Sequence, residues 1–300
     1  MSRYEFIRSE EGAFSLRDLC QVMSVSRSCY YAWRGGQTHL NRDRKGPLGI
    51  KVLEVFEYNE QRYGSRRVME ELNDQGHKVG RYKIRRLLRD LGLKAIQPKS
   101  FVPKTTQTNP NLQRSPYLLL EMEAITGVNV VWVGDITYIA LKDGRFLYLA
   151  IWMDLGNRLI VGWQLSPAMN ASIVIRSLQK AIAWRRPPPG LIVHSDGGGQ
   201  YMGTELRQSL ALNRFKQCMT RVENHYDNAF AESFFSRLKA ELMQGKPFET
   251  EAEAHAKIFE YIEIYHNRKR RHSALGYKSP NDFDQQSPEK QTIHVPIKSR

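Results

Sequence analysis

The chain has 300 residues, of which 45 are Lys or Arg and 31 are Asp or Glu, so its formal net charge at pH 7 is +14. That length accommodates a full catalytic core and one or two small domains, which excludes a single small module. No charged-then-apolar leader opens the sequence and no apolar run approaches about 18 residues, which argues against secretion and against membrane spanning.

The positive charge is concentrated in the first third of the chain. Residues 1–115 contain 22 basic and 12 acidic residues, a net charge of +10. Such a region is a candidate for binding a polyanion, although a merely soluble basic surface has the same composition. The three cysteines, Cys20, Cys29 and Cys218, match neither a disulfide framework nor a zinc pattern and suit a reducing cytosol.

Two short helices are predicted within residues 14–34, in an N-terminal segment covering residues 1–45. Apolar residues recur at helical spacing up to Met23, and after a break Ser26 is placed to cap a second helix. This spacing is typical of a helix-turn-helix, in which Arg27 and Ser28 at the exposed start of the second helix reach a major groove. An ordinary helical hairpin explains the pattern equally well.

A second helical domain is expected over residues 46–96. Its clearest segment, 81–91, has apolar residues on one face and basic residues largely opposite, and the turn at residues 63–67 is also basic. A charge-rich helix face is most often only solvated, but here we expect DNA contacts, mainly to the phosphate backbone. The residues expected to make them are Arg66, Arg67, Arg81, Arg85 and Arg86.

Residues 97–118 are predicted to be a linker. They contain Pro98, Pro103, Pro110 and Pro116 in a polar stretch without apolar periodicity, which favours an extended, semi-rigid segment and a domain boundary. A catalytic domain is expected over residues 119–283, followed by a polar, poorly ordered tail over residues 284–300.

The catalytic domain is predicted to be an α/β domain with a mixed five-stranded sheet and flanking helices. The expected strands are 130–140, 145–155, 158–166, 191–194 and 215–220, and the expected helices are 171–185 and 204–212. Turns of Asp143-Gly144 and Gly156-Asn157 make the first three strands antiparallel neighbours. The crossover helix at 171–185 returns the fourth strand parallel to the first.

Three acidic residues in this domain are candidate ligands. Asp135 lies in the middle of the first strand, where an ionised side chain needs a compensating partner. Asp196 ends the fourth strand, and Glu232 lies on a helix whose apolar face includes Phe234. Carboxylates are the hard oxygen ligands that Mg²⁺ takes, and this set suits two-metal phosphodiester chemistry. Taken singly, each acid also has an ordinary explanation, as a bulge residue, a turn cap or a solvated helix residue.

The words around the three acids are WVGDITY, HSDGGGQY and YDNAFAESFFSRLK. In order, spacing and flanking letters they resemble the DDE transposases of the insertion-sequence-three (IS-three) family, relatives of retroviral integrases. Residues 63–67 are similar to the family's YGxRR word and residues 267–280 to its YNxxRxHxxLGYxSP word, so the resemblance covers about residues 14–283. One departure is at Gly197 and Gly199, where the family's commoner word, HSDRGSQY, has Arg and Ser.

The resemblance implies an RNase H-like integrase core in which the first and fourth strands are adjacent and their acids meet. It implies an enzyme that cuts DNA at element ends and transfers the freed 3′-hydroxyl, with Asp135, Asp196 and Glu232 as catalytic residues that bind two Mg²⁺ or Mn²⁺ ions. The implied partners are double-stranded DNA of the terminal repeats and the target, further copies of the chain in a synaptic complex, and an upstream-frame OrfA protein or a frameshift fusion with it. The implied location is the bacterial cytosol.

Basic residues after Glu232 are expected to contact the same DNA. Lys239 follows Glu232 by two helical turns on one face, so its ammonium is expected near the scissile bond, and in the family the basic residue at this position contacts the element end. After a final helix at about 251–266, a basic run is also expected to bind DNA through Arg268, Arg271 and His272, although a helix C-cap is the alternative.

Two other functions fit parts of the pattern. An RNase H-like nuclease or a phage-type integrase would use the same metals on other DNA, and binding to terminal repeats would separate it from a transposase. A basic DNA-binding regulator with a vestigial catalytic domain would not need all three acids. The intact set of Asp135, Asp196 and Glu232 argues against such decay.

Overall fold

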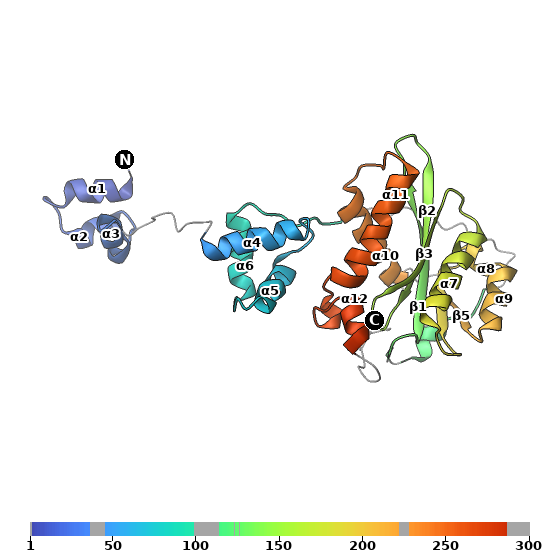
Figure 1. The fold of residues 1–300 in the computed structure, drawn as a ribbon. Helices are drawn as coiled ribbons and strands as arrows, with labels where there is room; N and C mark the ends of the chain where they lie inside the picture. The colour runs from blue at the N-terminus through green and yellow to red at the C-terminus, as the bar shows by residue number, and fades with distance from the viewer. Residues whose placement is uncertain are drawn as a thin grey trace. The chain divides into compact units, whose positions relative to one another are not determined.

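The computed structural model describes residues 2–36, 46–98, 114–122, 124–125, 127–221 and 228–286, which fall into two compact units, Met1–Ala95 and Ile96–Arg300 (Figure 1). In these ranges no helix combines the length and the apolar character needed to cross a bilayer.

The first unit begins with three short helices, α1 (Arg3–Glu10), α2 (Leu16–Val22) and α3 (Arg27–Arg34). They pack around Ile7, Leu19, Cys20 and Tyr30, all of them buried. The predicted N-cap is confirmed, because the Cys29 amide donates to the Ser26 hydroxyl over 3.1 Å. Helix α1 was not predicted, although Ser2 and Glu5 form a capping box at its start. The Ser2 hydroxyl accepts from the Glu5 amide over 3.2 Å, and the Glu5 carboxylate accepts from the Ser2 amide over 2.6 Å.

The same unit continues with α4 (Pro47–Tyr58), α5 (Ser65–Asp74) and α6 (Arg81–Asp90). Their buried side chains are Val52, Val55, Phe56, Val68, Leu72, Ile84 and Leu88. The basic segment predicted at 81–91 is thus a helix that buries one apolar face and exposes the opposite, cationic one.

The second unit contains a mixed five-stranded sheet in the order β3-β2-β1-β4-β5. Its strands are β1 (Val131–Ala140), β2 (Phe146–Asp154), β3 (Ile160–Ser166), β4 (Ile192–Ser195) and β5 (Lys216–Met219). Pairs β1–β2 and β2–β3 are antiparallel, whereas β1–β4 and β4–β5 are parallel. The predicted topology is therefore confirmed, including the adjacency of the first and fourth strands.

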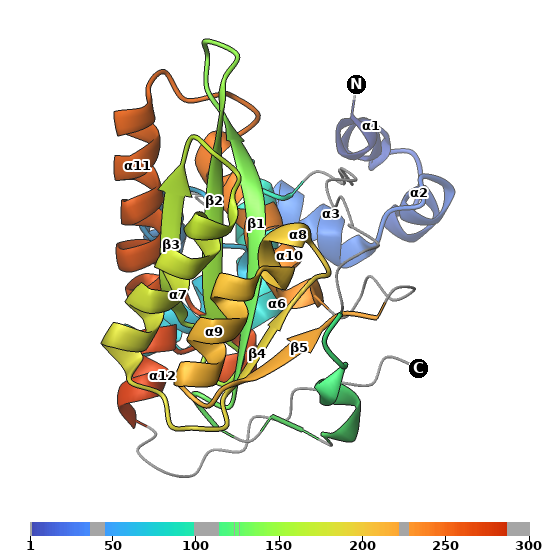
Figure 2. The same ribbon diagram turned by 90° about the vertical axis from the view of Figure 1, so that its right-hand side faces the viewer.

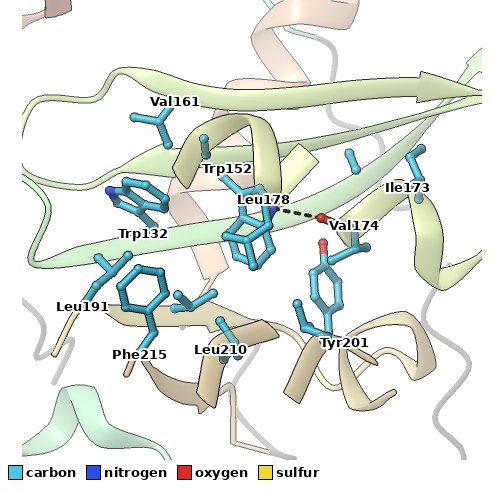
Figure 3. Packing of buried hydrophobic residues seen from close by; sticks show 14 of the residues in the cluster. Trp132, Trp152, Val161, Ile173, Val174, Leu178, Leu191, Tyr201, Leu210 and Phe215 are labelled. Carbon is cyan, nitrogen blue, oxygen red and sulfur yellow. Dashed lines mark hydrogen bonds between the residues drawn. The ribbon is translucent and has the colours of Figure 1, made fainter. Parts of the chain in front are cut away.

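Helices cover both faces of this sheet (Figures 1 and 2). On one face lie α7 (Ala171–Arg185), α8 (Gly199–Met202) and α9 (Thr204–Leu212); on the other lie α10 (Ala229–Leu238) and α11 (Glu251–Phe259). Two buried tryptophans of the sheet, Trp132 and Trp152, form the centre of the core beneath α7 (Figure 3). Gly134 is required there, because a Cβ at this position would overlap the Trp152 ring.

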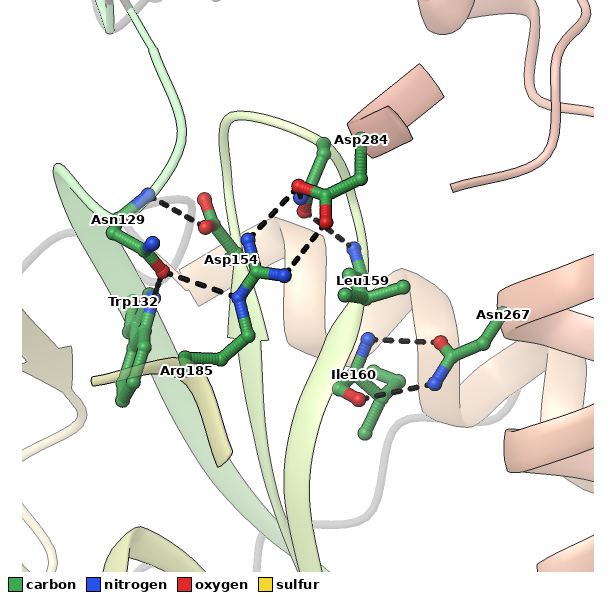
Figure 4. A network of polar contacts seen from close by, with 9 residues as sticks. Asn129, Trp132, Asp154, Leu159, Ile160, Arg185, Asn267 and Asp284 are labelled. Carbon is green, nitrogen blue, oxygen red and sulfur yellow. Dashed lines mark hydrogen bonds and ion pairs between the residues drawn. The ribbon is translucent and has the colours of Figure 1, made fainter. Parts of the chain in front are cut away.

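Helices α10 and α11 both continue as π-helical segments, Lys239–Met243 and Glu260–Lys269. The second segment covers the outer strand β3: the Asn267 side chain accepts from the Ile160 amide over 3.0 Å and donates to the Ile160 carbonyl over 3.1 Å (Figure 4). A side-chain amide thus satisfies the backbone groups of an edge strand that would otherwise face solvent.

The C-terminal part of the second unit corrects one predicted boundary. Residues 284–286 were expected to begin a tail, but they belong to a helix, α12 (Pro280–Gln286). The Arg185 guanidinium donates to both oxygens of Asp284 over 2.6 and 2.8 Å, and the Asn157 amide donates to the same carboxylate over 2.7 Å (Figure 4). The polar sequence resembled a tail because these partners lie about a hundred residues away. Residues 287–300 lie outside the described residues.

The linker prediction is also corrected at its end. Residues 114–118 lie along β5: the Ser115 hydroxyl donates to Gln217 over 2.8 Å, and the Leu118 amide donates to the Cys218 sulfur over 3.2 Å. A 3₁₀ helix, Leu118–Glu121, follows. The second unit therefore includes residues before 119, because β5 offers polar groups that this segment satisfies. The predicted linker residues 99–113 lie outside the described residues.

Candidate active site

Two of the three predicted acids, Asp135 and Asp196, occupy neighbouring positions on two adjacent strands of the sheet. In the parallel register of β1 and β4, Gly134 is opposite Ser195. Asp135 and Asp196 are the next residues along β1 and β4. They therefore occupy neighbouring positions just beyond the residues at which these two strands pair. This position is the carboxyl end of β4, where open α/β sheets bind their ligands.

Glu232 reaches this region from another layer of the fold. It lies on α10, which packs on β1, where Ala231 shares a buried cluster with Val131 and Val133. The buried side chains Phe234 and Phe235 lie on the same helix. Glu232 itself is exposed, on the side of the helix away from these apolar residues. The predicted apolar face thus fixes the helix, and the acid lies on its free side.

The three carboxylates act on one another electrostatically. Burial raises the pKa of Asp135 well above its usual range, and the negative charges of Asp196 and Glu232 raise it further. Two effects oppose this shift: the Ile136 amide donates to Asp135 over 2.8 Å, and Lys239 contributes a positive charge. Asp135 therefore lies in the field of two further carboxylates and of one ammonium.

These side chains fit a hard divalent cation in chemistry, because all three are carboxylates and their mutual repulsion is what a bound cation relieves. They are not yet gathered as ligands: within the described ranges, no three His, Cys, Asp or Glu side chains are arranged to hold a metal ion. A metal centre formed by these three residues therefore requires their carboxylates to come closer together than they are in this structure.

Lys239 lies beside the acids and not on an open helix face. Its ammonium is 3.8 Å from the centroid of the Tyr138 ring on β1, and the side chain is half-buried. Burial lowers the pKa of Lys239, and the charge of Asp135 opposes that shift. The helical phase predicted from Glu232 brings Lys239 to the site; its contact with DNA stays a prediction.

Tyr201 and Arg114 also border the site, and sequence reasoning did not identify either. Tyr201 is buried, and burial together with the charges of Asp135 and Asp196 raises its pKa well above the usual range. Its membership of the HSDGGGQY word was the only signal. The Arg114 guanidinium lies against the backbone of Gly197 and donates to the Thr220 carbonyl over 2.7 Å. Arg114 was predicted to be part of a linker, so the sequence did not indicate that its side chain lies at the site.

The predicted DNA-contacting residues of the first unit lie at exposed helix starts and faces. Arg27 and Ser28 are exposed at the start of α3, and Arg66 is exposed at the start of α5. Arg67 is half-buried, with its guanidinium 5.6 Å from the centroid of the Tyr63 ring. On α6 the exposed basic residues are Arg81, Lys83, Arg85, Arg86 and Arg89.

The C-terminal basic run does not form one surface. Arg268 is exposed, whereas Arg271 donates to the Tyr277 carbonyl over 3.3 Å and the His272 ring lies 4.9 Å from that of His266. Arg270, in the middle of the run, is buried and pairs with Glu241 over 3.1 Å. One member of the run is therefore structural, which its sequence did not indicate.

Comparisons with known families and proteins agree with this architecture. Residues 126–225 and 232–287 match families described as integrase core domains, and residues 41–101 match an HTH-like domain. The chain is 36% identical over 284 residues to the transposase InsF for insertion sequence IS3A of Escherichia coli, covering 94% of this chain and 98% of that protein. It is 39% identical over 237 residues to the transposase for insertion sequence element IS904 of Lactococcus lactis, covering 79% and 93%.

Among the solved structures that match are those of viral integrases. The intasome of simian T-cell lymphotropic virus, in complex with a PP2A regulatory subunit, matches with a TM-score of 0.48 and 14% identity, over 81% of this chain and 78% of that one. The HTLV-2 integrase catalytic core domain in complex with magnesium matches with a TM-score of 0.41 and 14% identity, over 53% and 97%.

Proposed function

The chain belongs to the IS-three family of insertion-sequence transposases, and from that premise we propose that Asp135, Asp196 and Glu232 are the catalytic residues of its DNA strand transfer. The protein is a transposase with an integrase core domain, a polynucleotidyl transferase by class. The proposal adds the residues, the metal and the order of bond changes.

One observation supports the assignment most strongly. Asp135 and Asp196 follow paired residues of two adjacent parallel strands, and the charges of both Asp196 and Glu232 raise the pKa of Asp135. Acids brought together at a strand end, against their own repulsion, are typical of functional sites and unusual where only stability is at stake. Their convergence therefore favours a shared ligand.

We propose that this ligand is divalent magnesium or manganese, two ions in all, held by the three carboxylates. When bound, such ions activate an attacking oxygen and stabilise the leaving oxygen of an in-line displacement. Asp135 and Asp196 are already adjacent, and Glu232 completes the set by a movement of α10 or of its own side chain. Lys239, beside Asp135, then orients a phosphate of the strand that is cut.

Two bond exchanges follow from this arrangement. In the first, a water oxygen bonds to the phosphorus at the element end, and the phosphorus–O3′ bond breaks, leaving a 3′-hydroxyl. In the second, that 3′-hydroxyl oxygen bonds to a phosphorus of the target strand, whose own O3′ leaves. Each step exchanges one phosphorus–oxygen bond for another, so neither a covalent protein intermediate nor ATP is required.

The proposed partners are DNA, further copies of the chain and an upstream-frame OrfA protein. We propose that α3, α5 and α6 bind the terminal repeats, with Arg27, Ser28, Arg66, Arg67, Arg81, Arg85 and Arg86 in contact with DNA, and that Arg268, Arg271 and His272 contact DNA near the catalytic unit. Several copies of the chain act together on two ends, with an upstream-frame OrfA protein or as a fusion with it. The proposed location of the protein is the bacterial cytosol, which contains its DNA substrate.

Strand cleavage and strand transfer on a duplex that carries the element's own end test the assignment. With Mg²⁺, Asp135→Asn, Asp196→Asn and Glu232→Gln should each reduce both reactions to background while DNA binding persists, because binding uses Lys and Arg. Glu205→Gln, which removes an exposed acid on α9, is the matched control and should stay active.

Three outcomes would contradict the proposal. Cleavage by the Asp196→Asn protein would remove that residue from the site. Cleavage of any duplex without preference for element ends would favour an RNase H-like nuclease. Sequence-specific binding without any cleavage by the unaltered protein would favour a regulator.

A further inference from the structure

Gly197, the residue after Asp196, is covered by a side chain from a distant part of the sequence. A Cβ at this position would overlap the guanidinium of Arg114, 83 residues earlier in the chain. Gly197 is not among the residues with a positive φ, so its backbone conformation accepts any L-amino acid. Glycine here therefore leaves the space that the Arg114 guanidinium occupies, and the turn itself does not depend on it.

The guanidinium of Arg114 lies across the carboxyl ends of two parallel strands. It contacts Gly197 after β4, and it donates one hydrogen bond of 2.7 Å to the carbonyl of Thr220, the residue that follows β5. Asp196, the proposed metal ligand, adjoins the first of these contacts. Arg114 thus places a positive charge at the carboxyl ends of the strands, where the reaction is proposed.

Among the residues that the structure describes, most of the donors of this guanidinium have no hydrogen-bond acceptor. Arginine carries five N–H donors, and within the described ranges the hydrogen bond to Thr220 is the one that Arg114 makes; no carboxylate there forms an ion pair with it. The side chain is half-buried, so it is held in place and still accessible. A planar, partly desolvated guanidinium with open donors is suited to bidentate binding of a phosphate.

We propose that Arg114 binds a phosphate of the DNA strand next to the bond that is cut, and that Gly197 makes room for it. This inference rests on the proposed function and adds a positioning residue to it. The positive charge of Arg114 lies beside Asp196 and that of Lys239 beside Asp135, so the strand would be held by a cation on each side of the acids. The commoner family word has an Arg at the position of Gly197, and here a guanidinium reaches the same place from the segment before β1.

Four variants test the proposal, each examined for DNA affinity against salt concentration, with a random-sequence duplex and with a duplex carrying the element's end. Arg114→Ala should weaken binding to both duplexes about tenfold and reduce the slope of log affinity against log salt by about 0.9, the value for one lost phosphate contact. Arg114→Lys should keep most of the slope. Gly197→Ala should resemble Arg114→Ala, because the new methyl group displaces the guanidinium.

The fourth variant, Arg114→Ala with Gly197→Arg, places the guanidinium on the other backbone position and should restore slope and cleavage toward the original values. Lys216→Ala, at the opposite end of β5, is the matched control and should lower neither end-specific binding nor cleavage. If Arg114 only anchors its segment to the sheet, Arg114→Ala will lower the melting temperature and leave the salt slope unchanged. An unchanged slope would overturn the inference even if the unaltered protein cleaves element ends; absence of that cleavage would instead refute the proposed function.

Discussion

The ammonium of Lys239 lies over an aromatic ring and within the field of an aspartate. Its distance to the centroid of the Tyr138 ring is 3.8 Å, and its charge lowers the pKa of Asp135 against the effects of burial and of the other two acids. A cation over a ring keeps its charge available, because the ring attracts it without neutralising it. Lys239 is thus held next to Asp135 with its positive charge still available.

Replacement of Lys239 by Ala should weaken the complex with element-end DNA and leave folding intact. If Lys239 contacts a base edge, the loss should be about 1–3 kcal/mol and confined to end DNA; if it contacts a phosphate, random DNA should lose affinity equally. Competition binding at fixed salt distinguishes the two. Unaltered affinity for both duplexes would mean that the ammonium stays on Tyr138 during the reaction.

A second buried acid, Asp154, has a structural role away from the site. Its carboxylate, at the end of β2, accepts from the backbone amide of Asn129 over 2.6 Å (Figure 4). It also accepts from the backbone amide of Gly156 over 2.8 Å. Burial nevertheless dominates and raises the pKa of Asp154 from 3.8 to about 6. The folded protein therefore holds a proton on Asp154 more tightly than the unfolded chain does.

The free energy of unfolding should fall as the pH rises through the pKa of Asp154. The stabilising contribution of the Asp154 proton is fully present below about pH 4 and is lost as the pH rises through about 6, a change of about 2–3 kcal/mol. Asp154→Asn should be less stable at low pH, because its amide cannot accept both N–H groups, but the gap to the unaltered protein should narrow as the pH rises from 4 to 7. Urea unfolding followed by tryptophan fluorescence measures this gap, and a gap that widens with pH would contradict the account.

The end of the π-helical segment after α11 shows how one element separates structural from exposed charge. Arg270 is 2% exposed and pairs with Glu241, which also accepts from the Tyr261 hydroxyl over 2.8 Å. Arg268, two residues away, is exposed. This buried pair joins the π-helical segment that continues α10 to the end of the segment that continues α11.

Arg270→Ala should destabilise the catalytic unit by about 3–5 kcal/mol, because Glu241 would remain buried without its partner. Arg268→Ala is the matched control and should change stability by less than about 0.5 kcal/mol. Denaturant midpoints of the two proteins give the comparison. Equal midpoints would show that the Glu241–Arg270 pair contributes nothing to holding the helices.

The elements that the sequence predicted are those whose signals are local. Alternating apolar residues with Asp143-Gly144 and Gly156-Asn157 turns identified the first three strands, and the crossover helix fixed the parallel pairing that brings Asp135 next to Asp196. The missed features depend on distant partners: Arg114 on Gly197, Asp284 on Arg185, and Arg270 on Glu241. No window of sequence contains both members of such a pair, so their polar residues were interpreted as linker, tail and DNA contact.

Across the whole molecule, the excess of positive charge and the cluster of acids lie in different units. The helix α6 of the first unit exposes a cationic face, whereas the acids lie in the second unit. We therefore expect DNA affinity and strand chemistry to be separable by mutation.

Removal of three charges from α6 tests this separation. The triple variant Arg81→Ala, Arg85→Ala, Arg86→Ala should reduce the slope of log affinity against log salt by about 2–3, since each lost phosphate contact removes about 0.9. The control triple Arg176→Ala, Lys180→Ala, Lys257→Ala removes equal charge from exposed positions of the second unit and should change the slope less. Equal changes in both would show that α6 is not the main DNA-binding helix.

The central claim is that the carboxylates hold a divalent metal during strand transfer, and metal rescue of the Asp196→Cys protein tests it most directly. A thiolate is a poor ligand for Mg²⁺ and a better one for the softer Mn²⁺. The account predicts that this variant binds element-end DNA normally, has no cleavage with Mg²⁺, and regains measurable cleavage with Mn²⁺. Normal DNA binding with no cleavage in either metal, or full activity with Mg²⁺, would contradict direct ligation by Asp196.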